Sequence, residues 1–416
     1  MSKTFIITGG NFLNKGAQAM TFVAVQELRE RFSGCKIHML SFSFEKNREN
    51  LKNNKLKFHC NKDSVIMRNY AAANIGGRIK IIVENKIKNI AKIVLRKGTI
   101  VRSDEIKLLD NLLLSTDAII DVSGYALSSV WSKQSAYNCV NLIKAAKNHN
   151  VPIYFMPQSF GPFDFPQSYS NEIRRLLKEY LPYAKVIYTR EKEGEKMMKD
   201  NFSLKNIKRS YDLVLQNKDI YIDNIFNSIK ENNIPEIKTQ NNVAVLPNMR
   251  TFDYSNQEDI IHLYKKIISC LLLDNKNIYL TRHSKEDILA CRLIKDMFPK
   301  NDRVMLLEND FNCIEYEEFI KKFDFLIASR YHSIIHAYKS GVPCIVLGWA
   351  TKYHELLESF EQNKYMFDVR ENIEAEKIVS ALKDMNDNNS IESKKILNIL
   401  AEIQKNNCFD ILNTLM

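Results

Sequence analysis

Two basic side chains, Arg330 and His332, come just after the apolar run 323–328 and Ser329. A helical pattern comes next, then Gly-Val-Pro at 341–343 and a second apolar run at 344–347. This order predicts a strand, a charged corner, a helix and another strand. In α/β folds, the place where a strand ends and a helix begins binds anions. We therefore expect an anion site at Arg330 and His332.

The residue types at this corner suit a small, multiply charged ligand. A guanidinium group matches a carboxylate or a phosphate with two parallel hydrogen bonds. An imidazole can donate to a phosphate oxygen and can also move a proton near neutral pH. In an extended segment, residues two apart share a side, so we expect Arg330 and His332 to face a cleft while Tyr331 faces away. The structural alternative is an arginine paired with a core carboxylate and a histidine that caps the helix.

A metal site is not predicted here, although His332 and His336 have a spacing that zinc sites use on helices. The chain has no His-Glu-x-x-His motif and no Cys-x-x-Cys pair. We therefore interpret His336 as a packed helix residue.

Three further polar residues follow apolar runs and are candidates for the same site. Asp121 can serve as a general base or bind sugar hydroxyls, or it can be only the N-cap of the next helix. Gln158, in the loop 157–162, can bind a ligand or fix its own loop. Arg190 follows the run 186–189 and is a second cation at a strand end, facing a ligand or paired with a neighbouring acid.

The turn 9–17 contains Asn14 and three glycines, and it links the first strand to the first helix. Glycine lets the backbone approach a ligand, and a helix N-terminus favours anions. The turn has neither the G-x-G-x-x-G nor the Walker spacing, so the glycines can also serve backbone geometry alone. Farther along, Lys352 is a lone lysine, a type that is more often solvated than functional, and Glu355 and Glu358 fit simple surface charges.

The elements that must position these residues alternate between short apolar runs and amphipathic stretches. This pattern predicts a parallel sheet covered by helices on both faces, and it restarts after a polar stretch rich in Asn and Lys. We therefore predict an α/β protein of two Rossmann-like domains facing each other across a cleft. The expected parts are an N-terminal domain (1–215), a junction (216–242), a C-terminal domain (243–390) and a C-terminal helix (391–416).

Size and composition agree with two globular domains. The chain has 416 residues, 45% of them hydrophobic, and no run approaches the ~20 apolar residues of a membrane span. Eight scattered cysteines and the absence of a signal-like N-terminus lead us to expect a reduced, cytoplasmic protein. The net charge of +11 favours anionic partners, or it reflects a solvated basic surface.

One basic segment, residues 78–102, interrupts the alternation. Its apolar residues recur at roughly helical spacing, and its charges are basic except for Glu84. Such a helix can lie on an anionic membrane surface, so peripheral contact with the inner face of the cell membrane is one hypothesis. An ordinary surface helix is the alternative. We expect no nucleic-acid partner.

The motifs together resemble those of the polysaccharide pyruvyl transferases. The resemblance extends over residues 5–357 and is carried by Asn14-x-Gly16 after Gly9-Gly10, Gln158-x-x-Gly161-Pro162, Thr189-Arg190-Glu191, Asp212, Ser329-Arg330-x-His332-Ser333, Gly341-Val342-Pro343 and Lys352. The block around Arg330 and His332 is the most specific of these. Two positions depart from the family pattern: Ala17 replaces a common acid, and Val122-Ser123-Gly124-Tyr125 replaces a glycine run.

The resemblance implies a GT-B-like fold and a reaction in cell-surface polysaccharide biosynthesis. Pyruvate would pass from phosphoenolpyruvate to two hydroxyls of a glycan sugar as a cyclic ketal, with no redox cofactor. The glycan, lipid-linked or free, would bind the N-terminal domain. Arg190 and His332, with Arg330 beside them, would hold the donor. We expect His332 and Asp121 to be catalytic, and Asn14, Gln158 and Lys352 to be further substrate-binding residues. Alternatives are a glycosyltransferase that uses a nucleotide sugar and a non-catalytic protein that binds glycans or membrane surfaces.

Overall fold

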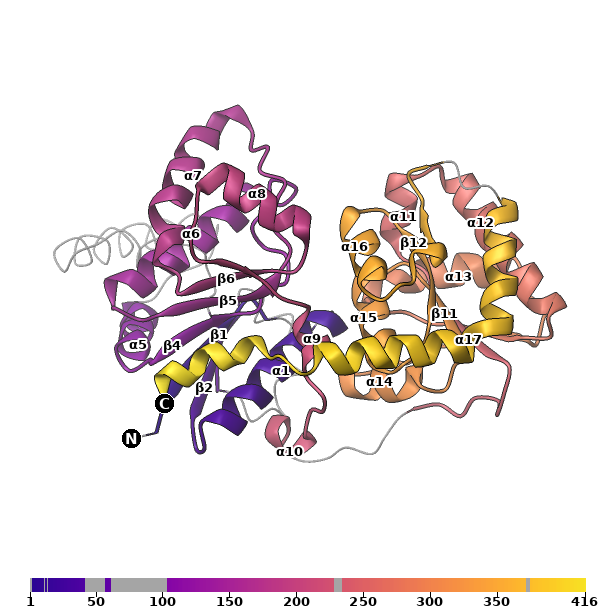
Figure 1. Ribbon diagram of the computed structural model, residues 1–416, viewed down its shortest axis with the longest axis horizontal. Helices are drawn as coiled ribbons and strands as arrows, with labels where there is room; N and C mark the ends of the chain where they lie inside the picture. The colour runs from indigo at the N-terminus through magenta and orange to yellow at the C-terminus, as the bar shows by residue number, and fades with distance from the viewer. Residues whose placement is uncertain are drawn as a thin grey trace, which may run out of the picture.

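The protein is built around two parallel β-sheets, each the centre of one α/β domain (Figure 1). The computed structural model describes residues 2–10, 12, 14–41, 57–60, 103–227, 234–371 and 375–416. In the N-domain, seven strands have the order β3-β2-β1-β4-β5-β6-β7. Their bounds are β1 (Thr4–Thr8), β2 (Lys36–Ser41), β3 (Lys57–Cys60), β4 (Ala118–Asp121), β5 (Ile153–Gln158), β6 (Val186–Thr189) and β7 (Ile207–Arg209).

The C-domain repeats this arrangement with six strands in the order β10-β9-β8-β11-β12-β13. Their bounds are β8 (Asn242–Leu246), β9 (Asn277–Leu280), β10 (Val304–Leu306), β11 (Phe325–Ala328), β12 (Cys344–Gly348) and β13 (Met366–Asp368). In both sheets the strand order reverses beside the first strand, between β1 and β4 and between β8 and β11. Ligands of open α/β sheets bind at such reversals, at the carboxyl ends of the strands.

Helices connect the strands and cover both faces of each sheet. In the N-domain they are α1 (Lys15–Arg31), α5 (Ser103–Leu114), α6 (Lys133–Asn148), α7 (Gln167–Tyr180), η1 (Leu181–Tyr183), α8 (Lys192–Phe202), α9 (Leu213–Gln216) and α10 (Ile222–Ile225). In the C-domain they are α11 (Met249–Tyr254), α12 (Gln257–Leu273), η2 (Lys285–Asp287), α13 (Ile288–Asp296), α14 (Cys313–Ile320), α15 (Tyr331–Lys339), α16 (Thr351–Ser359) and η3 (Asn363–Tyr365). The chain ends with α17 (Ala375–Ile403) and η4 (Cys408–Leu415).

The central strands are apolar on both faces, as parallel strands covered by helices must be. Along β1, Ile6 packs under α5, α6 and α7, while Phe5 and Ile7 pack against α1 on the other face. The C-domain strands alternate in the same way between a core under α12 and α13 and a core under α14 and α15. The two-residue period of the strand therefore divides each apolar run between two cores.

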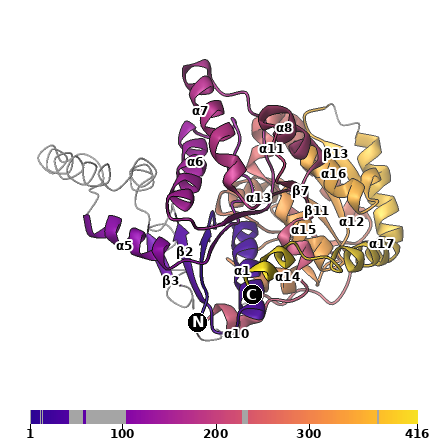
Figure 2. The ribbon, with the colours of Figure 1, turned by 60° about the vertical axis from the view of Figure 1, so that its left-hand side comes forward.

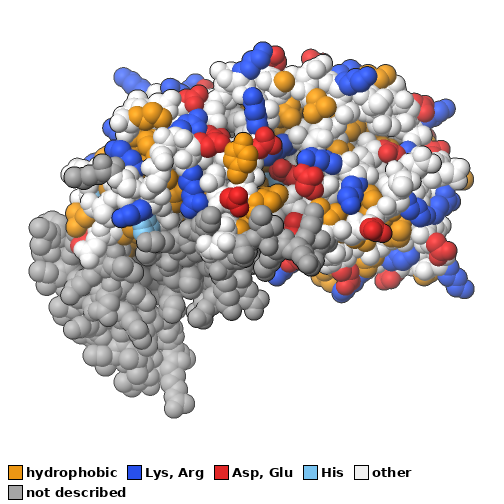
Figure 3. Space-filling view, turned by 90° about the horizontal axis from the view of Figure 1, so that it is seen from below, with side chains coloured by type: hydrophobic (Ala, Val, Ile, Leu, Met, Phe, Trp, Pro, Cys, Tyr) orange, Lys and Arg blue, Asp and Glu red, His pale blue; other side chains and the backbone are white. Residues whose placement is uncertain are grey.

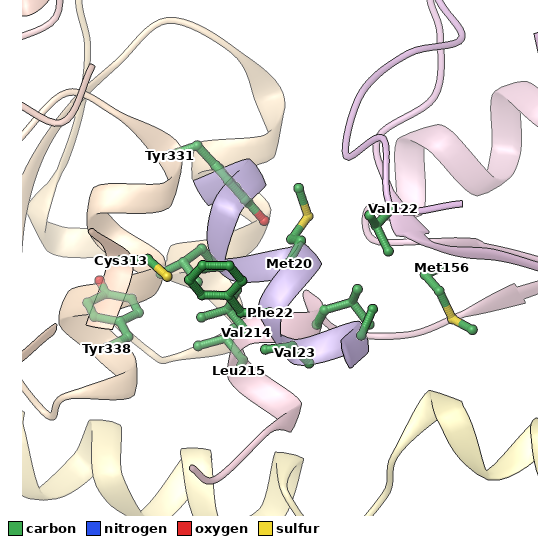
Figure 4. Close-up of a cluster of buried hydrophobic side chains, with 14 of the residues drawn as sticks. Met20, Phe22, Val23, Val122, Met156, Val214, Leu215, Cys313, Tyr331 and Tyr338 are labelled. Atoms are coloured by element: carbon green, nitrogen blue, oxygen red, sulfur yellow. The ribbon is translucent and has the colours of Figure 1, made fainter. Parts of the chain in front are cut away.

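One of these cores is continuous between the domains. The cluster that contains Phe5 and Ile7 of the N-domain also contains Leu326 and Ala328 of the C-domain. Figure 4 shows its centre, where side chains from α1 and α9 lie beside side chains from the C-domain. Helix α17 then leaves the C-domain, and the segment after it ends on the N-domain, close to the start of the chain in Figures 1 and 2.

The expected alternation is confirmed for the inner strands of both sheets. The sequence reasoning missed β3, β7, β10 and β13, which are the edge strands of the two sheets and have only three or four residues each. Helix α17 runs without a break through residue 390, where we expected a new helix to begin.

The basic segment 78–102, for which contact with a membrane surface was one hypothesis, lies outside the described residues. Within the described ranges, no helix combines the length and apolarity that a membrane span requires. On the coloured part of the face in Figure 3, basic and acidic side chains are interspersed rather than separated by sign.

Candidate functional site

The polar residues singled out in the sequence lie at the carboxyl ends of central strands in both domains. Asp121 is the last residue of β4, and Arg190 follows β6 in the N-domain. In the C-domain, Arg330 follows β11 and is the N-cap residue of α15, so His332 lies in the first turn of that helix. Asp121 and Arg330 thus flank the strand-order reversals of their sheets.

Arg190, Asp212 and His332 form a buried polar cluster that joins the two domains, here called the interface cluster. The Arg190 guanidinium donates from Nη1 to Asp212 Oδ2 at 2.5 Å and from Nη2 to Gly124 O at 2.8 Å and to Ser159 Oγ at 2.7 Å. His332 Nε2 of the C-domain lies 3.5 Å from the same Asp212 oxygen. One N-domain carboxylate therefore contacts a cation of its own domain and an imidazole of the other.

The charges of the interface cluster shift its pKa values in opposite directions. Burial alone would raise the pKa of Asp212. The contact with His332 and the positive charge of Arg190 lower it by a larger amount, so the net pKa is well below its ordinary value. Burial lowers the pKa of His332 below 6.5, although Asp212 acts in the opposite direction. At neutral pH the cluster therefore contains an ionised Asp212 and a neutral His332.

Tyr331 is placed differently from our expectation. The helix already begins at Tyr331, so the two-residue alternation of a strand does not continue through Arg330 and His332. The Tyr331 ring is buried, and the Arg190 Cζ atom lies 4.8 Å from its centroid. A cation and an aromatic face thus meet across the domain boundary. The expectation that Tyr331 faces away was wrong, and Arg330 and His332 do not share a direction.

Arg330 is held by two carboxylates of its own domain. Its Nε donates to Asp287 Oδ2 at 2.9 Å, and its Nη2 donates to Asp287 Oδ1 at 2.7 Å and to Glu286 Oε1 at 2.6 Å. Asp287 is fully buried, so this pairing has a structural function. Among the described residues, no hydrogen bond uses Nη1 of Arg330, which leaves one edge of the guanidinium for a ligand. Its role as a substrate-binding residue stays a prediction.

Asn14 and its neighbours insert the start of α1 into the C-domain. The Asn14 side chain caps α1 by accepting from the Gly16 and Ala17 N–H groups, and its Nδ2 donates to Ser284 Oγ of the C-domain at 3.4 Å. Gly16 packs on His332 so closely that a Cβ at Gly16 would be 2.1 Å from His332 Cγ. The glycine at this position is therefore required by a close approach between the two domains.

Lys352 lies in a pocket between the domains, here called the interdomain pocket. This cavity of about 250 Å³ is lined by Tyr125, residues 159–162 and residues of α8 from the N-domain, and by residues 349–352 and Arg370 from the C-domain. The Lys352 ammonium is within 5.8 Å of the ring centroids of Tyr125, Tyr331, Trp349 and Tyr353. Burial and the nearby charge of Arg190 lower its pKa to about 8.

The surroundings of Lys352 leave its ammonium among aromatic rings. Among the described residues, it has no hydrogen bond or ion pair, in contrast to Arg190 and Arg330. Aromatic faces stabilise a cation but neutralise none of its charge. Because desolvation disfavours the charged ammonium, an anion beside it would raise the pKa of Lys352, as the carboxylate of Glu191 already does in part.

Asp121 and Gln158 lie together in a second cavity, of about 450 Å³, here called the N-domain pocket. Gln158 Nε2 donates to Asp121 Oδ1 at 2.9 Å, and the Ser123 hydroxyl donates to Asp121 Oδ2 at 3.0 Å. Burial raises the pKa of Asp121, although these hydrogen bonds oppose the increase. The carboxylate is therefore more basic than an exposed aspartate, as a general base requires.

The structure thus brings the predicted residues together in three groups. Arg190 and His332 belong to the interface cluster, Lys352 lines the interdomain pocket, and Asp121 and Gln158 line the N-domain pocket. His336 is buried beside Glu317, with its Nδ1 at 2.9 Å from Oε1 of that residue. Within the described ranges, no group of His, Cys, Asp and Glu side chains is arranged to hold a metal ion.

Sequence reasoning missed the contacts that α16 makes with the start of α8. Glu355 of α16 accepts from the Lys192 and Glu193 backbone N–H groups, at 2.6 and 3.0 Å, at the N-terminus of α8. Glu358 pairs with the Lys192 ammonium at 3.0 Å. We had interpreted both glutamates as simple surface charges, because no local signal distinguishes a carboxylate that binds a distant helix from a solvated one.

Known structures share this architecture at low sequence identity. UDP-GlcNAc 2-epimerase from Neisseria meningitidis, bound to UDP-GlcNAc, superposes with a TM-score of 0.57 and 12% identity, covering 100% of this chain and 99% of that one. The enzyme of the same name from Methanocaldococcus jannaschii superposes with a TM-score of 0.52 and 13% identity, covering 92% of each chain. The glycosyltransferase SnogD from Streptomyces nogalater superposes with a TM-score of 0.51 and 13% identity, covering 97% of this chain and 95% of that one. These similarities show the GT-B-like fold alone.

Sequence comparison shows the family. No protein of curated function matches the chain. The family model described as polysaccharide pyruvyl transferase matches residues 14–351, which include Asn14, Arg190, Arg330 and His332 and end one residue before Lys352. The chain therefore belongs to the polysaccharide pyruvyl transferase family, and it is a transferase.

Proposed function

We propose that the protein transfers pyruvate from phosphoenolpyruvate to two hydroxyls of one glycan sugar, forming a cyclic ketal and releasing phosphate. The observation that carries the proposal is Lys352. Its ammonium lies in a pocket between the domains, among aromatic rings and without an ion pair among the described residues. A donor that bears both a carboxylate and a phosphate would supply the direct ion pair that Lys352 lacks among the described residues, beyond the charge of Glu191, which opposes the lowering of its pKa only in part.

The reaction needs only proton transfers and charge stabilisation. Protonation of the methylene carbon of phosphoenolpyruvate makes its C2 atom electrophilic, and the first sugar hydroxyl adds there. The second hydroxyl then displaces phosphate from C2 and closes the ketal. The two hydroxyl protons are balanced by the one gained at the methyl carbon and the one that leaves with phosphate. A base, an acid and cationic contacts suffice for these steps.

We assign the residues to these tasks from their positions. Lys352 binds the donor, and the unused edge of Arg330 and the cation Arg190 contribute further positive charge at the strand ends. His332 binds the phosphate or protonates it as it leaves; a phosphate near the imidazole would raise the lowered pKa of His332. Asp121, with its raised pKa, accepts a proton from a sugar hydroxyl.

The test is incubation of the purified protein with phosphoenolpyruvate and a panel of simple and lipid-linked glycosides. Phosphate release that depends on a glycoside, together with a product heavier by one pyruvyl group, supports the proposal. Parallel reactions with nucleotide sugars in place of phosphoenolpyruvate test the glycosyltransferase alternative. Sugar transfer from a nucleotide donor, with phosphoenolpyruvate inert, would overturn the assignment.

A further inference from the structure

We propose that the N-domain pocket binds a pyranose ring of the acceptor glycan, with Trp131 as the surface on which the ring stacks. The polar side chains of α6 and the Asp121–Gln158 pair would then contact the hydroxyls. This inference rests on the proposed function, because it identifies where the acceptor of that reaction binds. It adds a specificity-determining residue, Trp131, and a polar wall that the family motifs do not include.

The pocket has the size and the mixed lining of a small-molecule site. Its volume of about 450 Å³ lies within the range of about 300–1,000 Å³ typical of ligand pockets. Apolar atoms of Leu127, Leu142 and Phe155 lie beside the carboxylate of Asp121 and the amide of Gln158. A few polar groups within a largely apolar wall give a pocket its specificity.

One wall of the pocket is a polar stripe on α6. Ser132, Ser135 and Asn138 all line the cavity, and their spacing of three residues places them on one face of the helix. Ser132 is the N-cap residue of α6, but its side chain makes no capping hydrogen bond, and it is exposed. Its hydroxyl is therefore available to a ligand at the mouth of the pocket.

Two aromatic rings, those of Tyr125 and Trp131, form an apolar part of the pocket wall. Trp131 lines the pocket with 43% of its surface exposed, and the Tyr125 ring meets it edge to face at 5.5 Å. The Tyr125 hydroxyl donates to Gly161 O at 2.8 Å, which fixes this ring. An exposed indole at the mouth of a polar cavity offers a flat apolar surface that matches the C–H face of a sugar.

Tyr125 also connects this pocket with the donor side. The same residue lines the N-domain pocket and the interdomain pocket, and the Lys352 ammonium lies 5.2 Å from its ring centroid. A sugar on Trp131 would thus have its hydroxyls close to Asp121, which lines the same pocket, and Tyr125 would border both the acceptor and the donor. The two substrates of the proposed reaction would meet beside this ring.

The two tryptophans of the chain provide a binding assay that does not depend on turnover. In Trp349→Phe, Trp131 is the only indole and reports on the N-domain pocket. We expect methyl glycosides of galactose, glucose, mannose and their N-acetylated forms, at millimolar concentration, to include one that changes its emission saturably. In Trp131→Phe, the remaining Trp349 should respond to phosphoenolpyruvate instead. No response of Trp131 to any of these glycosides would overturn the inference.

Kinetics with the accepted glycan separate this inference from the proposed function. Trp131→Ala should raise the KM for the acceptor about tenfold or more, with the KM for phosphoenolpyruvate unchanged. Trp131→Phe should restore most of the loss, and Val130→Ala, at an exposed neighbour outside the pocket lining, is the matched control. An unchanged acceptor KM in active Trp131→Ala refutes the inference alone. Saturable glycoside binding without any pyruvyl transfer refutes the proposed function alone.

Discussion

Replacing Lys352 by methionine should make the protein more stable and unable to bind phosphoenolpyruvate. Methionine has a similar length and flexibility, so it keeps the apolar contacts with the surrounding rings while it removes the charge. The ammonium is costly in the unliganded protein because it is desolvated without an acid partner among the described residues. A group retained at a cost in stability is expected where a ligand provides the compensation.

The size of the effect follows from the pKa of Lys352. That pKa falls from 10.5 to about 8, because burial and the charge of Arg190 outweigh the charge of Glu191. One pH unit corresponds to about 1.4 kcal/mol, so the charged ammonium costs roughly 3 kcal/mol in total. A ring contact at this range returns on the order of 1 kcal/mol. We therefore expect a net gain of about 1–2 kcal/mol for Lys352→Met, or a rise in Tm on the order of 5 °C.

The pH dependence gives the sharper test. Between pH 8 and 10.5 the unfolded state binds more protons at Lys352 than the native state, so the wild-type protein gains stability as pH rises through this window. The advantage of Lys352→Met should be complete below pH 8 and should shrink toward pH 10.5. Differential scanning fluorimetry at several pH values, with and without phosphoenolpyruvate, measures both the advantage and the ligand-induced rise in Tm.

Lys364 is the matched control. It also lies over an aromatic ring, that of Tyr365 at 4.7 Å, but it is paired with Asp384 and Glu392, whose hydrogen bonds raise its pKa despite partial desolvation. Lys364→Met should therefore destabilise the protein at neutral pH. The reasoning fails if Lys352→Met lowers Tm at pH 7, if its advantage does not change with pH, or if phosphoenolpyruvate still stabilises it.

Three other substitutions test the remaining contacts of the site. His332→Gln should lower kcat by at least about 100-fold; full pyruvyl transfer in a folded variant would contradict the role of His332. Asp212→Asn leaves Arg190 buried without its carboxylate and should cost about 3–5 kcal/mol in chemical denaturation, so a neutral result would contradict the pairing. Glu355→Gln weakens the contact with the α8 backbone N–H groups. We expect the KM for phosphoenolpyruvate to rise and to become less sensitive to the salt concentration. Kinetics identical to those of the wild type would show that this contact does not hold the domains together.

Much of the fold could be predicted because the central strands carry a strong local signal. Strands such as β11 and β12 are buried on both faces and therefore appear as unbroken apolar runs. The edge strand β7 has the sequence Ile-Lys-Arg, with two of its three residues exposed, so nothing in its composition distinguishes it from a loop. Its place in the sheet is determined by pairing with β6, which is a tertiary property.

The candidate site could be located from the sequence, but its pairings could not. Residues at strand ends are predictable because the α/β alternation shows where strands stop. The partner of Arg330 is 43 positions away, and the helix that Glu355 contacts is 163 positions away. The first pair depends on how the C-domain folds, and the second depends on how the two domains are placed relative to each other. Trp131 gave no signal either, because its value as a binding surface arises only from the cavity beside it.

The path of α17 has a consequence for engineering by domain exchange. The described segment after this helix packs on the N-domain: Cys408 N–H donates to Gln216 Oε1, and Arg31 pairs with Asp410. A chimera joined near residue 230 would combine α1 of one parent with α14, α15 and the final segment of another. To change the acceptor by recombination, one would have to transplant residues 404–416 together with the N-domain and match Gly16 to the histidine that packs on it.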